Sequence, residues 1–329
     1  MLLRLNARAE TWPLAAPFRI SRGVKHAADV LVVELSQEGA LGRGESIPYA
    51  RYGETLDSVL KQIRDARDAL TDRTPSRDVG ELMPPGAARN AVDCALWDLT
   101  AKLSKRSVTD LLRTPPLEPM VSALTVSLDE PEAMLAAAAA ISDAPLIKVK
   151  VDASQPDRQI MAVRRGAPRA KLIVDPNESW SLELLRELQG LLKEARVDLI
   201  EQPLPAGTDE LLDGFESVCA ICADESCHVA SDLVQLEGRY QAVNIKLDKA
   251  GGLTAALELL NAARSRGFKV MVGCMICTSL GIAPALHVAR YADFVDLDGP
   301  WWLKEDRAAG IRFEAGILHP PGAELWGDV

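Results

Sequence analysis

Lysines and acids recur through the middle of the chain, each at or beside the end of a short apolar run. They are Lys148, Lys150, Asp175, Glu201, Asp224 and Lys246. Apolar runs of this kind are typical of buried parallel strands, and a β/α barrel collects the carboxyl ends of its strands on one face. The pattern therefore predicts carboxylates that share a metal ion, with lysines on either side. Such a site suits the removal of a proton from carbon.

Three carboxylates end the predicted third, fourth and fifth strands of the barrel, at Asp175, Glu201 and Asp224. Each of them alone is equally consistent with a helix N-cap or a surface acid. Three carboxylates in register on adjacent strands repel one another, and a divalent cation removes that repulsion. Oxygen ligands without histidine or cysteine select a hard ion, so we predict Mg²⁺, with Mn²⁺ as a substitute.

Two of the lysines, Lys148 and Lys150, point to the same side of their strand because side chains alternate along it. A solvated strand face explains an isolated pair, but the neighbouring Ile147 and Val149 predict a buried strand. Lys246 ends the sixth predicted strand, which lies opposite the second in an eight-stranded barrel. We therefore expect Lys150 and Lys246 to face each other across the metal. One would take a proton from carbon and the other would return it to the opposite face, as in a racemase or epimerase.

A second acidic pair, Asp296 and Asp298, lies at the end of the eighth predicted strand, just before Gly299. The two side chains share one face of that strand. A turn that begins here is one explanation of the pair. We favour the alternative that the two carboxylates hold a substrate ammonium through charge-assisted hydrogen bonds.

The spacing of the apolar runs indicates the fold. Eight of them begin near residues 121, 147, 172, 199, 221, 243, 270 and 294, at intervals of 22 to 27 residues. Even spacing favours a β/α barrel over an open doubly wound sheet, and the first run is not followed by the Gly-x-Gly-x-x-Gly of a dinucleotide-binding fold. Before residue 115, strands precede helices, which predicts a small α+β domain. We therefore predict a capping domain at 1–115, a barrel at 116–310 and a tail at 311–329 that packs back on the capping domain.

The composition is that of a globular protein, with 48% hydrophobic and 26% charged residues among 329. The net charge of −10 disfavours nucleic acid or an anionic membrane as a partner, because both attract basic surfaces. The sequence contains no apparent signal peptide or transmembrane helix, so we expect a cytoplasmic protein. The sequence leaves open whether the protein forms a homo-oligomer.

Two Cys-x-x-Cys pairs, Cys219/Cys222 and Cys274/Cys277, superficially suggest zinc. The 51 residues between the pairs exceed the usual spacing of a zinc ribbon, and both pairs lie in apolar strand-like sequence. We therefore expect buried, reduced thiols, as is usual in the cytosol.

Five motifs together resemble the enolase superfamily, and within it the muconate-lactonising subgroup. They are Ile147-Lys-Val-Lys, Val174-Asp-Pro-Asn-Glu-Ser, Ile200-Glu-Gln-Pro, Ala223-Asp-Glu-Ser and Asn244-Ile-Lys-Leu-Asp-Lys-Ala-Gly-Gly. Three further stretches resemble the L-Ala-D/L-Glu (dipeptide) epimerases of that subgroup. These are Cys222-Ala-Asp-Glu-Ser-Cys-His, Gly273-Cys-Met-Ile-Cys-Thr-Ser and Asp296-Leu-Asp-Gly-Pro. The resemblance spans essentially the whole chain and implies a (β/α)7β-type barrel with an α+β capping domain.

The resemblance also implies a reaction. A dipeptide epimerase of this kind interconverts L-Ala-L-Glu and L-Ala-D-Glu, with Lys150 and Lys246 as the two acid/base groups. Mg²⁺ and Lys148 would stabilise the enediolate, as the superfamily's lysine-and-magnesium chemistry implies. Asp296 and Asp298 would hold the amino terminus of the dipeptide. The family expectation for the pathway is the recycling of peptidoglycan peptides.

In that family, cations on a loop of the capping domain hold the side chain of the terminal glutamate. The matching stretch here is Phe18-Arg-Ile-Ser-Arg-Gly-Val-Lys, which offers Arg19, Arg22 and Lys25. The sequence leaves open which of the three binds substrate.

Other reactions use the same lysines and metal, namely those of N-acylamino acid racemase, o-succinylbenzoate synthase and muconate cycloisomerase. Their substrates carry no free ammonium for Asp296 and Asp298, so we rank them below the epimerase. A barrel retained only for binding would have lost a base or a metal ligand, and none of these residues is missing.

Overall fold

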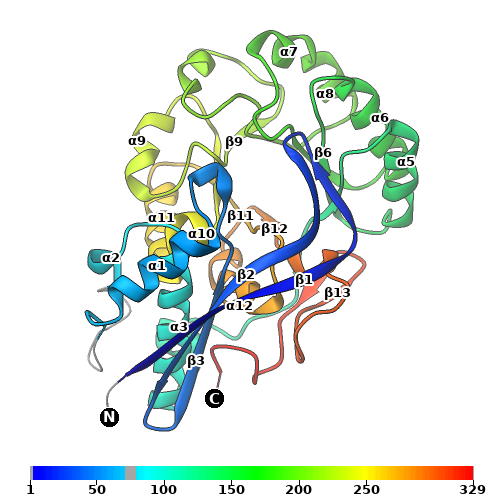
Figure 1. Ribbon diagram of the computed structural model, residues 1–329. Helices are drawn as coiled ribbons and strands as arrows, with labels where there is room; N and C mark the ends of the chain where they lie inside the picture. Colours follow the sequence, from blue (N-terminus) through cyan, green and yellow to red (C-terminus); the bar gives the residue numbers. More distant parts are fainter. Residues whose placement is uncertain (1–2, 71–78, 329) are drawn as a thin grey trace.

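The chain folds into a ring of parallel strands beside a long antiparallel sheet (Figure 1). The computed structural model describes residues 3–70 and 79–328. Residues 1–2, 71–78 and 329, which the predicted capping domain and tail include, lie outside the described residues.

Eight parallel strands form the ring, and each begins within three residues of its predicted start. In chain order they are β5 (Leu124–Val126), β6 (Leu146–Lys150), β7 (Lys171–Asp175), β8 (Leu199–Glu201), β9 (Ala220–Ala223), β10 (Ala242–Ile245), β11 (Lys269–Gly273) and β12 (Phe294–Asp296). Each strand pairs with its neighbours in the sequence. Between the first and last strands, the backbone N–H of Ala123 donates to the carbonyl of Val295 at 2.8 Å. The predicted barrel is therefore confirmed.

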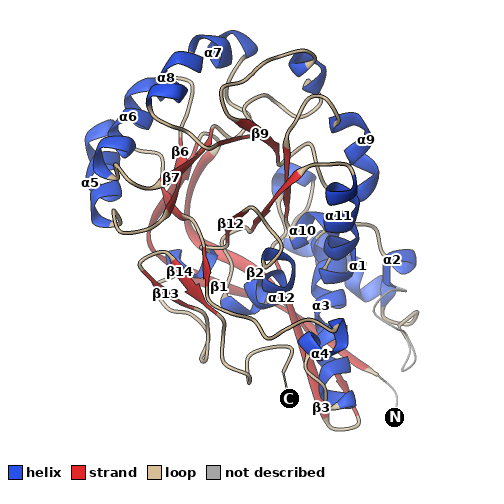
Figure 2. Cartoon of the chain, turned by 180° about the vertical axis from the view of Figure 1, so that it is seen from behind, coloured by secondary structure: helices blue, strands red, loops and turns tan. Residues whose placement is uncertain are grey.

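Helices surround the outside of the ring (Figure 2). They are α5 (Pro131–Ala140), α6 (Pro156–Gly166), α7 (Leu182–Glu187), α8 (Gln189–Glu194), α9 (Leu233–Leu236), α10 (Leu247–Ala250), α11 (Leu253–Ser265) and α12 (Ser279–Ala289). Their starts follow ordinary rules, since α5 and α6 begin with proline and the Ser181 hydroxyl accepts from the Leu184 N–H at the start of α7. Between β8 and β9 the described residues form only a short 3₁₀ turn, η3 (Asp209–Leu212).

The residues before the barrel form an antiparallel sheet with helices, as predicted for an α+β cap. The sheet has the order β1 (Arg4–Ile20), β2 (Gly23–Gln37), β3 (Ala40–Ser46), and the helices are α1 (Leu56–Ala66), α2 (Val79–Leu82), α3 (Ala87–Ser104) and α4 (Val108–Leu112). Gly44 allows α3 to pack directly on β3, because a Cβ there would collide with the carbonyl of Ala91. None of the described helices is both long and apolar enough to cross a bilayer.

The last residues return to the first part of the chain. Strands β13 (Arg312–Glu314) and β14 (Ile317–His319) form a small sheet with β4 (Met120–Val121). Beyond them, Trp326 Nε1 donates to the carbonyl of Cys94 at 3.1 Å, and the Gly327 N–H donates to Asp98 Oδ1 at 2.7 Å. Both acceptors belong to α3, so the tail contacts the helix that packs on the antiparallel sheet.

Candidate active site

The interior of the barrel is built in two layers. The floor is a cluster of apolar side chains from the strands: Ala123, Leu146, Ile173, Leu199, Cys222, Ala242 and Met271. Because alternate residues of a strand face the same side, residues two positions further along also point inward. In β6, β7, β8 and β10 these positions hold Lys148, Asp175, Glu201 and Asn244. An apolar floor therefore lies beneath a polar layer at the carboxyl ends of the strands.

The three carboxylates that the sequence predicts as metal ligands lie in this layer. Asp175, Glu201 and Asp224 are each at most 1% exposed. Burial and the negative charges of both neighbours raise the pKa of Glu201 to about 7. Burial acts in the same direction on Asp175 and Asp224, but adjacent lysines outweigh it and lower the pKa of both. Negative charge is therefore most costly at Glu201, in the middle of the three.

Lys148 lies among these carboxylates. Its Nζ is 2.5 Å from Glu201 Oε2, 2.8 Å from Asp296 Oδ2 and 3.1 Å from Asp175 Oδ2. Burial alone would lower the pKa of Lys148, but the carboxylates outweigh it and raise the pKa well above its ordinary value. Lys148 is therefore a fixed positive charge at the centre of the polar layer.

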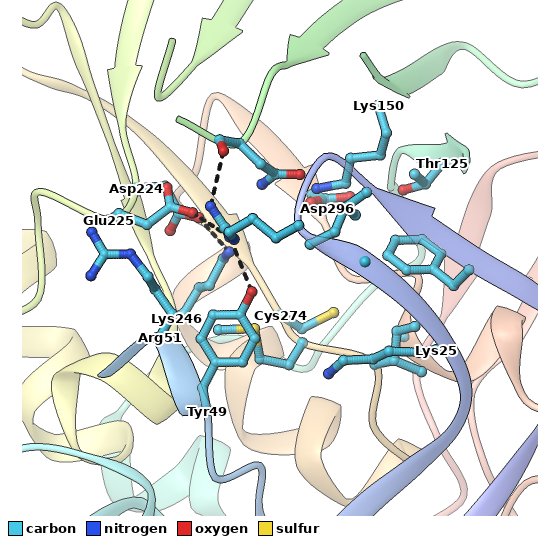
Figure 3. Close-up of a pocket in the computed structure, with 18 of the residues that line it drawn as sticks. Lys25, Tyr49, Arg51, Thr125, Lys150, Asp224, Glu225, Lys246, Cys274 and Asp296 are labelled. Carbon is cyan, nitrogen blue, oxygen red and sulfur yellow. Dashed lines mark hydrogen bonds and ion pairs between the residues drawn. The ribbon is translucent and has the colours of Figure 1, made fainter. Parts of the chain in front are cut away.

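Lys150 and Lys246 extend into the cavity from different sides (Figure 3). Lys150 Nζ lies 2.5 Å from Asp175 Oδ2, and Lys246 Nζ lies 2.6 Å from Asp224 Oδ2. Burial lowers the pKa of Lys246, and Asp224 and Glu201 reverse that effect and raise it well above its ordinary value. The carboxylate cluster thus has an amine on each flank.

Sequence reasoning missed two members of the layer, Lys249 and Asn244. Lys249 is 2% exposed, and its Nζ donates to the carboxylate of Asp224 at 2.6 Å. It also donates to the backbone carbonyls of Asp224 and Asn244. The Asn244 side chain donates to Glu201 Oε1 at 2.8 Å. Lys246 precedes α10 as its N-cap residue, and no local pattern signals that Lys249 reaches Asp224, because that contact joins separate elements.

The acidic pair at the end of β12 also faces the cavity. Asp298 Oδ2 accepts from the Thr125 N–H at 2.7 Å and from Trp302 Nε1 at 3.3 Å. Burial and the charge of Asp296 raise the pKa of Asp298 to about 6. Asp296 uses Oδ2 to bind Lys148, and its buried Oδ1 has no hydrogen-bond partner among the described residues. That oxygen is a free acceptor beside the cavity.

A cavity of about 510 Å³ joins these groups to two segments of the cap. We call residues 18–25, the tip of the β1–β2 hairpin, the first capping loop, and residues 49–53, which include η1 (Ala50–Tyr52), the second capping loop. Phe18, Ile20 and Val24 give the cavity an apolar wall. The stretch expected to be a loop is mostly paired strand, because β1 and β2 extend to Ile20 and Gly23.

The three predicted capping-loop cations have different surroundings. Arg19 does not line the cavity, and it binds Asp129 at 3.1 Å. Strand alternation places Phe18 and Ile20 toward the cavity and Arg19 away from it. Arg22 lines the cavity but its guanidinium is taken up by protein acceptors, including Glu225 at 2.8 Å. Lys25 lines the cavity 5.4 Å from the centre of the Tyr49 ring, and within the described ranges no carboxylate pairs with it.

The donor set fits a hard cation. In the described part of the chain, no three acidic, imidazole or thiol groups are arranged around one point as the ligands of a metal ion would be. The ammonium groups of Lys148 and Lys150 lie between the carboxylates instead. Glu201 Oε2 lies 2.5 Å from Lys148 Nζ, but the geometry of this ion pair is not that of a hydrogen bond. Buried, crowded carboxylates that supply only oxygen are the ligands that Mg²⁺ and Mn²⁺ accept. The six cysteines are all free, and Cys274 lines the cavity without joining this set.

Comparison with known proteins gives matches over nearly the whole chain. L-Ala-D/L-Glu epimerase of Escherichia coli is 46% identical over 312 residues, which cover 94% of this chain and 97% of that protein. N-acetyl-D-glutamate racemase of a Pseudoalteromonas species is 45% identical over 303 residues, 91% of this chain and 95% of that protein. A crystal structure of an enolase family member from Agrobacterium tumefaciens, with homology to dipeptide epimerases and with bound sodium and L-Ala-L-Glu, superposes with a TM-score of 0.96 at 44% identity. The superposition covers 99% of this chain and 100% of the chain in that crystal structure.

Two family models match separate parts of the chain. Residues 3–113 match the mandelate racemase / muconate lactonizing enzyme N-terminal domain, and residues 132–323 match the enolase C-terminal domain-like family. The resemblance inferred from the motifs is therefore confirmed. The chain belongs to the mandelate racemase / muconate lactonizing enzyme group of the enolase superfamily.

Proposed function

We propose that this protein is a dipeptide epimerase that interconverts L-Ala-L-Glu and L-Ala-D-Glu at the C-terminal residue. The observation that carries the proposal is the pair of amines, Lys150 and Lys246, on different sides of one carboxylate cluster. Inversion at carbon by proton transfer needs a proton acceptor on one face and a proton donor on the other. The relative named L-Ala-D/L-Glu epimerase and the similar structure with bound L-Ala-L-Glu support the choice of substrate.

Different side chains of the site have different roles in the proposed reaction. One of the amines Lys150 and Lys246 removes the α-proton of the C-terminal residue, and the other, as an ammonium, delivers a proton to the opposite face. The fixed charge of Lys148 stabilises the negative charge that develops on the substrate carboxylate. The apolar floor excludes water beneath the reacting carbon, so the returning proton comes from a lysine. The free oxygen of Asp296 and the carboxyl of Asp298 receive the substrate ammonium.

Asp175, Glu201 and Asp224 are the residues that would hold Mg²⁺, with Mn²⁺ as a substitute. Their burial, their oxygen-only chemistry and the raised pKa of Glu201 support this assignment. The relative with bound sodium and L-Ala-L-Glu supports a cation beside a dipeptide. When bound, the divalent ion supplies Lewis-acid stabilisation of charge on the substrate carboxylate and competes with the lysines for the three side chains.

The direct test is incubation of the protein with Mg²⁺ and L-Ala-L-Glu in D₂O, followed by NMR at the glutamate α-position. We expect deuterium at that carbon together with the D-epimer. Absence of both deuterium and the epimer would overturn the proposal.

A second candidate is racemisation of N-acetylglutamate, which the 45% identical racemase favours. An N-acetyl substrate has no ammonium, so Asp296 and Asp298 would face a neutral amide. Running the same NMR experiment with N-acetyl-L-glutamate separates the two candidates. Faster inversion of N-acetylglutamate than of the dipeptide would favour the racemase.

Lys25 is expected to set the preference for glutamate. Lys25→Ala should lower kcat/KM for L-Ala-L-Glu about tenfold or more, because a charge-assisted contact contributes roughly 1.5–3 kcal/mol. The same change should leave kcat/KM for L-Ala-L-Met within about twofold, since that side chain has no charge to pair. Lys25→Arg, which keeps the charge, is the matched control. An equal loss for both dipeptides would remove Lys25 from side-chain recognition.

The pH dependence of KM is expected to report Asp298. Because burial raises the pKa of Asp298 to about 6, its carboxyl becomes neutral as the pH falls through that value and no longer attracts an ammonium. KM for L-Ala-L-Glu should therefore rise below about pH 6, by up to about tenfold per unit. Asp298→Asn should show a high KM with this rise removed. The same rise in the variant would assign it to another group.

We also propose the narrower expectations that follow from this activity. A dipeptide epimerase acting in peptidoglycan recycling would work in the cytoplasm, and the six free cysteines support a reducing compartment. The proposed domains are a capping domain at 1–115, a barrel at 116–310 and a tail at 311–329. The proposal is compatible with a homo-oligomer.

A further inference from the structure

Glu178, a residue outside the predicted site, gathers cations from both capping loops. Arg51 of the second loop donates two parallel hydrogen bonds to it, Nε to Oε2 at 2.8 Å and Nη2 to Oε1 at 2.7 Å. Arg22 of the first loop donates from Nη1 to the same Oε2 at 2.9 Å. The Glu178 side chain is only 8% exposed, whereas the side chains of Arg22 and Arg51 are 27% and 40% exposed, so water reaches these contacts from the arginine side. One carboxylate thus binds two segments that are separate in the cap.

The backbone around Glu178 is held in an unusual conformation. Asn177 and Glu178 both have positive φ, 47° and 68°, although neither is glycine. Two consecutive residues of this kind are unfavourable and persist only where surrounding contacts fix them. Here the Asn177 N–H donates to Asp175 Oδ1 at 2.9 Å, and the Glu178 N–H donates to the Gln202 carbonyl at 2.9 Å. The turn is therefore anchored on β7 and on the residue after β8.

This turn presents further acceptors to the first capping loop. The carbonyl of Asn177 accepts from Arg22 Nη1 at 3.0 Å and from the Ser21 hydroxyl at 3.3 Å. The hydroxyl of Tyr49 in the second loop accepts from Arg22 Nη2 at 3.0 Å. Arg22 therefore contacts the turn and the second loop at once, and these contacts explain why its guanidinium is unavailable to substrate.

We propose that Glu178 is a positioning residue that holds both capping loops over the cavity. It does not line the cavity, so its effect on substrate passes through Arg22 and Arg51. Holding the loops closed keeps Lys25 and the apolar wall where the substrate side chain lies. The turn also begins beside Asp175, so the same few residues fix a proposed metal ligand and the loops that close the site.

The test uses Glu178→Gln in the full chain, with Asp213→Asn as the matched control. Asp213 receives two hydrogen bonds from Arg239, a comparable arginine–carboxylate pair at the surface and away from the cavity. In hydrogen–deuterium exchange of the substrate-free protein, residues 18–25 and 49–53 of Glu178→Gln should exchange about tenfold faster, as loss of a charge-assisted pair implies. The barrel strands should exchange as in the control. Unchanged exchange in both loops would overturn the proposal.

A kinetic arm rests on the proposed epimerase activity. In Glu178→Gln, KM for L-Ala-L-Glu should rise about tenfold while kcat changes less than about twofold, because bases and metal ligands are untouched. A fall in kcat with unchanged KM would contradict the positioning role. If wild-type protein shows no epimerisation, the proposed function fails, and the exchange measurement still decides the role of Glu178.

A second variant keeps the test valid if Glu178→Gln folds poorly. Arg51→Gln removes the two-point contact from the other side and leaves the strained turn intact. This variant should exchange faster in residues 49–53. Adding Glu178→Gln should cause little further change in the exchange of these residues, because both variants break the same contact between Arg51 and Glu178. Fully additive effects would show that the two side chains act independently.

Discussion

Lys150→Ala and Lys246→Ala are each expected to lower epimerisation of L-Ala-L-Glu by about a hundred- to ten-thousandfold. Each variant removes one of the two proton-transferring groups, and general acid–base catalysis by a single side chain contributes roughly 10²–10⁴-fold. Because the remaining lysine still faces one side of the α-carbon, each variant should exchange the α-proton of one epimer only. NMR in D₂O with L-Ala-L-Glu and L-Ala-D-Glu measures both effects.

Lys171→Ala is the control for this pair. Lys171 begins β7 at the other end of the barrel and is exposed, so its loss should leave turnover unchanged. Complementary exchange by the two variants, one with each epimer, would establish that the amines act on opposite faces. Exchange of the same epimer by both variants would place the two amines on one side and end the two-base mechanism.

Glu201→Gln is expected to abolish the stabilisation of the protein by magnesium while leaving the metal-free protein folded. In the wild type, Mg²⁺ that binds only the folded state at a hundred times its Kd adds about 2.7 kcal/mol to the free energy of unfolding. Burial and the neighbouring carboxylates raise the pKa of Glu201 to about 7, so a neutral amide relieves repulsion when metal is absent. Thermal unfolding with and without Mg²⁺ measures the difference. Epimerisation should fall about a thousandfold, since Lewis-acid stabilisation contributes several kcal/mol.

Glu132→Gln serves as the control, because this glutamate lies exposed on α5. Its response to magnesium should equal that of the wild type. An unchanged response in Glu201→Gln would place the ion elsewhere. A metal-free Glu201→Gln protein that is strongly destabilised would contradict the argument from repulsion.

The sequence predicted the parts of the site that follow from strand alternation. Each barrel strand is a short apolar run, so its end and its inward face can be read from the residues alone. That is why Asp175 and Glu201 were found, and why all eight strands begin close to their predicted positions. The family motifs then supplied the reaction, which no periodicity contains.

Features that depend on contacts between distant segments were not predictable in the same way. Nothing in the local sequence around Lys249 says that its side chain reaches Asp224, because that contact needs β9 and α10 to be neighbours. Arg22 offered the same charge as Lys25, and the folded positions of Glu178 and Glu225 show that Arg22 is already bound. The outward direction of Arg19 depended on the length of β1, which pairing with β2 extends to Ile20.

The return of the tail to α3 has a consequence for how the chain matures on the ribosome. The contact from Gly327 to Asp98 joins residues 229 positions apart, and Trp326 covers the carbonyl of Cys94 in the same region. Contacts so distant in sequence form only after residues 326 and 327 have emerged. Until then, this part of α3 lacks its partner from the tail.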